Sequence, residues 1–129
     1  MKTNRAVLGL GSNIDPEENI RKAIKIISRE VSLIKASSFV ETEPVGFKEQ
    51  RSFLNGALLI ETPLGASDLK TRLREIESGL GRVRTSNKNG PRAIDLDILV
   101  WNGEVVDDDV YERGFLRDSI KELLPGIAL

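Results

Sequence analysis

The 129-residue sequence contains neither cysteine nor histidine. Without cysteine there are no disulfides, thiolate nucleophiles or cysteine-ligated zinc sites, which is typical of a protein of the reducing cytosol. Without histidine there is no Ser–His or Cys–His catalysis and no imidazole metal site. Any chemistry must therefore come from carboxylates, guanidinium and ammonium groups, and hydroxyls.

Aromatic residues, charge of one sign and long apolar runs are also scarce. Aromatic residues make up 5% of the chain, and 19 basic against 20 acidic residues leave a formal net charge of −1. No overall positive field therefore attracts nucleic acid or an anionic membrane. No apolar run approaches the roughly 20 residues that span a bilayer. We expect a cytoplasmic, unprocessed monomer whose partners are small molecules, not nucleic acid or a membrane.

Hydrophobic periodicity predicts six elements in the order β-α-β-β-α-β. Apolar or alternating runs predict strands at residues 6–10, 31–41, 53–61 and 94–101. Apolar stripes at helical spacing predict one helix after the first strand and one after the third. This order is that of the ferredoxin-like α+β fold, in which two helices cover one face of an antiparallel sheet. The opposite face is then open to ligands, and we expect the whole chain, residues 1–129, to form a single domain.

The two predicted helices have recognisable starts. Asp15 before Pro16 predicts the N-cap of the first helix, with Glu18 completing a capping box. Ser67 is expected to cap the second helix. The apolar stripes are Ile20, Ala23, Ile24 and Ile27 in the first helix and Leu69, Leu73, Ile76 and Leu80 in the second. A further short helix is predicted at residues 116–124.

Gly9 and Gly11 resemble the start of a glycine-rich dinucleotide-binding motif. However, Ile14 stands where the third glycine of that motif belongs, and no parallel βαβ unit follows. We therefore expect a tight turn from strand to helix, with the first strand ending before Gly11.

A polar segment rich in cations leads into the last predicted strand. Arg82, Arg84, Lys88 and Arg92 lie among glycine, asparagine and serine, and no acidic residue interrupts them. Guanidinium groups bind phosphate oxygens through paired, charge-assisted hydrogen bonds. The composition is that of a phosphate-binding loop, although a solvated basic loop fits the cations alone equally well.

Asp95 and Asp97 follow directly and lie two residues apart on that strand. Both carboxylates project from one face, together with Leu99 and Trp101, because side chains alternate along a strand. The opposite face is expected to carry Ile94, Leu96, Ile98 and Val100. Two carboxylates held this way repel unless a cation lies between them. An isolated Asp-x-Asp pair is commonly structural, but beside a phosphate-binding loop it favours Mg²⁺.

Phe53 and Asn55 share one face of the third predicted strand, the face turned away from the helices. Phe53 and Phe115 could each be core residues, the commoner place for phenylalanine. Phe53 is the stronger candidate for a ligand contact, since it lies on the polar side of its strand.

The run Gly90-Pro91-Arg92-Ala93-Ile94-Asp95-Leu96-Asp97 resembles the signature of the hydroxymethyldihydropterin pyrophosphokinases. Other matching segments are Gly11-Ser12-Asn13, Thr42 to Gly46, Phe53-Leu54-Asn55, Glu77, Gly81 to Arg84, and Arg113-Gly114-Phe115. The resemblance implies an ATP-dependent enzyme of folate biosynthesis. Such an enzyme transfers pyrophosphate from ATP to 6-hydroxymethyl-7,8-dihydropterin and releases AMP.

The resemblance also implies a role for each matching residue. Asp95 and Asp97 would hold two Mg²⁺ ions around the phosphates of ATP, the co-substrate, and would be catalytic together with Arg82 and Arg92. The implied nucleotide-binding residues are Glu77, Arg84, Arg92, Ile98 and Arg113. The implied pterin-binding residues are Thr42, Pro44, Val45, Gly46, Phe53, Asn55 and Phe115, with the ring between the two phenylalanines.

The sequence departs from the family pattern near its end. The family usually carries a Pro-His pair before the Arg-Gly-Phe motif, whereas residues 107–112 here contain no histidine. Asn89 replaces a common aromatic residue, and the C-terminal region after Phe115 is unusually short. One alternative is therefore a catalytically weak or silent pterin- or nucleotide-binding module on the same fold. The other is an RNA-binding domain, which a single Phe53 beside Asn55 fits less well.

Overall fold

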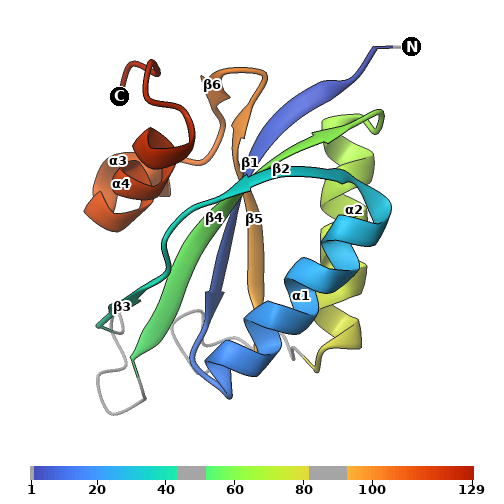
Figure 1. The fold of residues 1–129 in the computed structure, drawn as a ribbon, viewed down its shortest axis with the longest axis vertical. Helices are drawn as coiled ribbons and strands as arrows, with labels where there is room; N and C mark the ends of the chain where they lie inside the picture. Colours follow the sequence, from blue (N-terminus) through green and yellow to red (C-terminus); the bar gives the residue numbers. More distant parts are fainter. Residues whose placement is uncertain (1, 44–51, 82–92) are drawn as a thin grey trace.

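The structure is a computed structural model that describes residues 2–43, 52–81 and 93–129. In these residues a sheet lies between two groups of helices (Figure 1). The predicted loop residues Pro44, Val45, Gly46, Arg82, Arg84 and Arg92 lie outside the described residues. The strands are β1 (Asn4–Ser12), β2 (Ser32–Ala36), β3 (Val40–Thr42), β4 (Phe53–Thr62), β5 (Asp95–Trp101) and β6 (Glu104–Val105). The helices are α1 (Pro16–Glu30), α2 (Ala66–Gly79), α3 (Asp109–Glu112) and α4 (Gly114–Leu123).

The strands form an open antiparallel sheet in the order β2-β4-β1-β5-β6. β3 pairs with β4 on the same edge as β2, since the other edge of β4 pairs with β1. The α+β class and the antiparallel sheet predicted from the sequence are therefore confirmed.

One face of the sheet packs against α1 and α2. Their buried residues are Ile20, Ala23 and Ile27 in α1 and Leu69, Leu73 and Ile76 in α2, as the helical stripes predicted. They meet sheet residues that include Leu8, Leu58, Ile60 and Leu96. Figure 1 shows both helices on this side of the sheet.

The opposite face is not open over its whole length, as the sequence led us to expect. Val110 of α3 and Ile120 and Leu123 of α4 form a second core with the sheet. Their sheet partners are Val7, Ala57, Leu59, Leu99 and Val100. The amphipathic pattern of residues 116–124 correctly predicted a helix but gave no partner for its apolar side. The part of this face that carries Asp95 and Asn55 lies beyond the second core.

A β-bulge in β5 corrects the predicted alternation of its side chains. Val7 pairs with Val100 and Leu8 pairs with Ile98, so Leu99 is an extra residue in β5. Leu99 and Val100 consequently both join the core below α4, and Trp101 packs on the α1 and α2 side. The predicted faces of Val100 and Trp101 were therefore wrong.

The predicted strand at residues 31–41 is broken into β2 and β3. At the break, Ser37 is buried and replaces regular pairing with its own bonds to Ala57. Its N–H donates to the Ala57 carbonyl at 2.9 Å, and its hydroxyl accepts from the Ala57 N–H at 2.8 Å. Phe39 then lies against Gly56, where a Cβ atom would come within 2.5 Å of the ring. Gly56 makes this close packing possible.

Three local predictions about strand and helix ends were wrong. β1 continues through Ser12, so Gly9 and Gly11 lie within a strand and not in a turn. Asp15 is the N-cap residue of α1 and Pro16 its first residue, as predicted, but Asp15 adopts a left-handed conformation (φ 40°) without a side-chain cap bond, so the capping box is absent. α2 begins at Ala66, after Gly65 as the N-cap, two residues earlier than a Ser67 cap requires.

No helix among the described residues combines the length and the apolar character needed to cross a bilayer.

We expect α4 to be an integral part of the core. Ile120 is fully buried against the sheet, so Ile120→Ala should lower the free energy of unfolding by about 2–5 kcal/mol. Lys121→Ala, one position along on the exposed side, should change it by less than about 0.5 kcal/mol. Urea unfolding of both variants measures the difference, and equal effects would contradict this assignment of the second core.

Candidate active site

Strand register brings the predicted metal and pterin residues to one end of the sheet. Gly11 in β1 pairs with Asp95 on one side and with Asn55 on the other, and Gly9 pairs with Asp97. Adjacent strands lie about 4.8 Å apart, so the Asp95 and Asn55 backbones are separated by roughly 10 Å. The strand between them contributes no side chain at Gly11.

The absence of a side chain at Gly11 makes room for the Asn55 amide. A Cβ atom built on Gly11 would lie 2.6 Å from Asn55 Oδ1. The other end of the amide is also fixed, because Asn55 Nδ2 donates to Thr42 Oγ1 at 2.6 Å. Thr42 pairs in turn with Phe53 across β3 and β4. The structure thus brings together Thr42, Phe53 and Asn55, three of the residues predicted to bind pterin.

Arg74 and Glu77 of α2 hold the backbone of β5 between the two aspartates. Glu77 is 1% exposed, and its Oε2 accepts the Leu96 N–H at 2.7 Å. Arg74 pairs with the same oxygen at 2.8 Å, donates to the Leu96 carbonyl at 2.7 Å, and reaches Asp97 Oδ1 at 3.1 Å. A buried carboxylate is stable when a cation and hydrogen-bond donors satisfy it in this way.

Sequence reasoning missed Arg74. The available signal was its i,i+3 spacing to Glu77, which places both side chains on one face of the helix. That spacing is common on exposed helices, so it did not separate Arg74 from the other charges of α2.

The charge of Asp97 is unfavourable in the absence of a bound cation. Burial and, to a smaller extent, the nearby Asp95 together raise the pKa of Asp97 to about 6, against the opposing effect of Arg74. Asp107, in the connection between β6 and α3, also raises this pKa. The segment that lacks the family histidine therefore supplies a third carboxylate near the pair.

The remaining predicted site residues come from two elements. Arg113 precedes α4, and the half-buried Phe115 lies in its first turn. α4 packs on the sheet face that carries Ala57 and Leu59, which is also the face of Asn55. Ile98 lies on the other face of β5 and packs against the core below α1 and α2.

Asp95 and Asp97 fit a hard divalent cation such as Mg²⁺. They supply oxygen ligands on one face of β5, and their mutual repulsion is relieved when a cation binds. Among the described residues, no group of three or more acidic side chains could hold a metal by itself. The remaining ligands would therefore be phosphate oxygens and water, which Mg²⁺ commonly retains.

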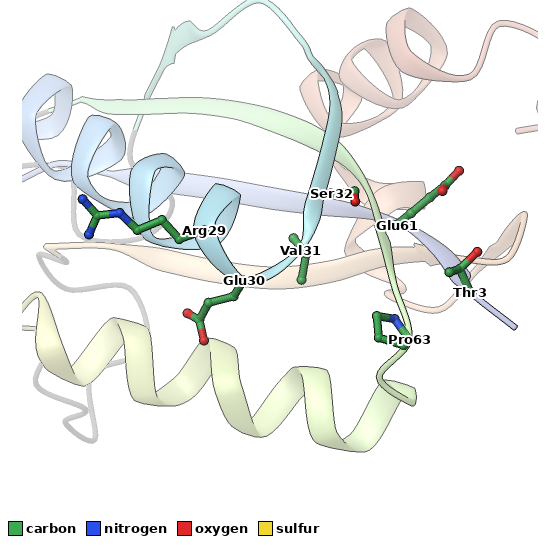
Figure 2. Close-up of a pocket in the computed structure, with 7 residues that line it drawn as sticks. All are labelled: Thr3, Arg29, Glu30, Val31, Ser32, Glu61 and Pro63. Atoms are coloured by element: carbon green, nitrogen blue, oxygen red, sulfur yellow. The ribbon is translucent and has the colours of Figure 1, made fainter. Parts of the chain in front are cut away.

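A separate cavity of about 310 Å³ lies at the other end of the sheet, where α1 leads into β2 (Figure 2). Its walls include Glu30 and Glu61, which form ion pairs with Arg72 and Arg5. Along β1, the Arg5–Glu61 pair lies six residues before the Gly11–Asn55 pair of the candidate site. The lining residues are Thr3, Arg29, Glu30, Val31, Ser32, Glu61 and Pro63. This cavity is not the candidate active site.

The family model described as 7,8-dihydro-6-hydroxymethylpterin-pyrophosphokinase (HPPK) matches residues 7–125. The chain belongs to this family. The HPPK match begins in β1 and ends after α4, so it includes every element that contributes to the candidate site.

Individual relatives agree with the HPPK assignment. A 2-amino-4-hydroxy-6-hydroxymethyldihydropteridine pyrophosphokinase of Bacillus subtilis is 38% identical over 131 residues, covering 93% of this chain and 78% of the relative. The enzyme of the same name from Haemophilus influenzae is 36% identical, covering 96% of this chain and 84% of the relative. Folic acid synthesis protein FOL1 of Dictyostelium discoideum is 33% identical, but this similarity spans only 20% of that protein.

Asp97 should make the metal-free protein less stable as the pH rises. Its pKa increases from 3.8 to about 6 on folding, so between these values the folded state binds more protons than the unfolded state. The free energy of unfolding contributed by Asp97 is then highest below about pH 4, falls as the pH rises to about 6, and levels off above it.

Asp97→Asn, which cannot ionise, should remove this part of the pH dependence. Urea unfolding in EDTA at several values between about pH 4 and 7 measures it as the difference between the variant and the parent. Asp118→Asn, an exposed aspartate of α4, is the matched control and should keep the parent's slope. Equal slopes in the parent and the Asp97→Asn protein would contradict the assignment.

Proposed function

We infer that this protein is an ATP-dependent pyrophosphokinase of folate synthesis. It transfers pyrophosphate from ATP to 6-hydroxymethyl-7,8-dihydropterin and releases AMP. The observation that carries this conclusion is the HPPK match over residues 7–125. The proximity of the Asp95 and Asp97 pair to Asn55 across β1 supports it.

We propose that the fold is ferredoxin-like and that residues 1–129 form one domain. The strand order β2-β4-β1-β5 with α1 and α2 on one face supports the first part. The proposal of one domain is supported by the two cores, which share β1, β4 and β5. That the protein acts as a cytoplasmic monomer stays a prediction from the sequence.

Asp95 and Asp97 would hold Mg²⁺, two ions in our proposal. When bound there, Mg²⁺ supplies charge neutralisation on the phosphates of ATP. Arg74 holds one oxygen of Asp97 at 3.1 Å, while Glu77 fixes the strand behind it. The two carboxylates are thus presented from a rigid backbone, as a positioned metal site requires.

The transfer itself depends mainly on positioning and charge. The hydroxymethyl oxygen of the pterin forms a bond to the β-phosphorus, the bond from that phosphorus to the α-phosphate oxygen breaks, and AMP leaves. In-line displacements of this kind rely on alignment and charge stabilisation, so histidine is not essential. Arg82 and Arg92 are proposed to neutralise the moving group. The residues proposed to place the nucleotide are Glu77, Arg84, Arg92, Ile98 and Arg113; the buried Glu77 would act by holding β5, and Ile98 lies on the other face of that strand.

Asn55 and Thr42 are proposed to read the hydrogen-bonding edge of the pterin. The Asn55 amide is held at its Nδ2 end by Thr42, and its Oδ1 lies over Gly11, so the bond to Thr42 sets which end is the donor and which the acceptor. Phe53 and Phe115 would enclose the ring by stacking. The backbone of Pro44, Val45 and Gly46 would complete the pocket.

The test of this function is the nucleotide product. The protein, MgATP and the pterin alcohol should yield AMP and the pterin diphosphate in equal amounts. Asp95→Ala and Asp97→Ala should each reduce turnover by at least ~10³-fold, equivalent to about 4 kcal/mol of lost stabilisation. Full activity of the Asp97→Ala protein would contradict the metal site. Absence of AMP from the parent protein would instead favour the silent binding module.

Phe53→Ala should weaken pterin binding more than ATP binding. The substitution removes a stacking partner worth roughly 0.5–1.5 kcal/mol in addition to its buried area. Tyr111→Ala, an aromatic that is 60% exposed on α3, is the matched control and should leave both affinities unchanged. Calorimetric titration gives the two affinities. Unchanged pterin affinity together with a much lower melting temperature would show that Phe53 is a core residue.

A further inference from the structure

One carboxylate ties the last turn of α4 to the bend between β2 and β3. Glu122 accepts the backbone N–H of Ser38, at 3.0 Å to Oε1 and 3.1 Å to Oε2. The Ser38 hydroxyl donates to Oε1 at 3.0 Å. Lys35 Nζ donates to the Glu122 carbonyl at 3.2 Å. These four bonds form the α4 latch, which joins residues 84 to 87 positions apart in the sequence.

The bend held by the α4 latch leads directly to the proposed pterin contacts. Ser37 fixes one side of the bend through its bonds to Ala57, while Ser38 faces Glu122. β3 follows at once and ends at Thr42, whose hydroxyl accepts the Asn55 amide. β3 is three residues long and, in the described part of the chain, pairs only with β4. Its position therefore depends strongly on the bend before it.

The other end of α4 carries residues proposed to contact ligands. Arg113 precedes the helix, and Phe115 lies in its first turn. A helix of this length spans about 15 Å and moves as a rigid body. Fixing its last turn at Glu122 therefore also fixes the direction in which its first turn points.

We propose that Glu122 is a positioning residue for the pterin pocket. By binding Ser38, it fixes Phe115 at one end of α4 relative to Thr42 and Asn55 beyond the bend. This inference rests on the proposed function, because the pocket it positions is the proposed pterin pocket.

The α4 latch acts on geometry more than on stability. Ile120 and Leu123 hold α4 on the sheet without Glu122, and β4 holds β3 by strand pairing. Glu122 and Ser38 are both exposed, so water replaces their bonds when one partner is removed. Removing the carboxylate therefore leaves both elements folded but removes three of the four bonds that set their relative position.

Glu122→Ala should raise the KM for 6-hydroxymethyl-7,8-dihydropterin roughly three- to tenfold, the effect of losing a few exposed hydrogen bonds to a charged group. The kcat at saturating pterin and MgATP should change by less than about twofold, since the bound geometry is still reached. Glu122→Gln, which keeps an acceptor for the Ser38 N–H, should give an intermediate KM. All assays are run at least about 20 °C below each variant's melting temperature, so that unfolding does not contribute.

Asp118→Ala is the matched control. Asp118 is an exposed carboxylate on the same helix, and no hydrogen bond or ion pair is recorded for it among the described residues. Its removal should leave the pterin KM unchanged. Ser38→Ala should raise the KM in the parent protein but add nothing in the Glu122→Ala background, because the two side chains act as one unit.

Equal pterin KM values in the Glu122→Ala and Asp118→Ala proteins would overturn the proposal, as would additive effects of Ser38→Ala and Glu122→Ala. Calorimetric binding of the pterin with a non-hydrolysable MgATP analogue keeps this test separate from turnover. If the parent binds pterin without producing AMP, the proposed function fails, while weaker pterin binding by Glu122→Ala still supports the positioning role. If the parent does not bind pterin, both proposals are overturned.

Discussion

The repulsion between two carboxylates on one face of β5 is the constraint on which the rest of the site depends. Burial makes the charge of Asp97 costly, and the neighbouring charge of Asp95 adds to this cost, so the site favours a bound cation. Two side chains of α2 bind the backbone of β5 between the two aspartates. Glu77 binds the Leu96 N–H between the two aspartates, and Arg74 spans Glu77, the Leu96 carbonyl and Asp97. The backbone between the two carboxylates is therefore fixed.

The sheet face opposite α1 and α2 has two parts with different roles. Toward one end, Val7, Leu59 and Val100 pack below α3 and α4 and contribute to stability. Toward the other end, β1 carries glycine, so that Asn55 and the aspartates lie on a face with little side-chain bulk between them. α4 connects the two parts, since its last turns are core and its first turn carries proposed ligand contacts. This arrangement explains how a short chain supports both a second core and a binding face.

Sequence periodicity predicted the features that follow from regular helix and strand geometry. The apolar stripes of α1 and α2 follow from a repeat of 3.6 residues. The shared face of Asp95 and Asp97 in β5, and that of Phe53 and Asn55 in β4, follow from a repeat of 2 residues. Departures from regularity were not predictable. The bulge at Leu99, the break at Ser37 and the partner of α4 depend on contacts between distant segments. Arg74 was missed because its role appears only when β5 is packed against α2. The family resemblance supplied the roles of the remaining site residues, and those roles stay predictions.

The bulge at Leu99 adds one residue to β5 without changing which face of the sheet the residues on either side of it occupy. A deletion of the Leu99 codon would keep the downstream reading frame and restore strict alternation, and Trp101 would stay on the α1 and α2 side because Val100 already pairs with Val7. The aspartates upstream would keep their orientation. The cost of removing the bulge is therefore the loss of the Leu99 side chain from the core below α4, and not a reversal of the faces of the strand.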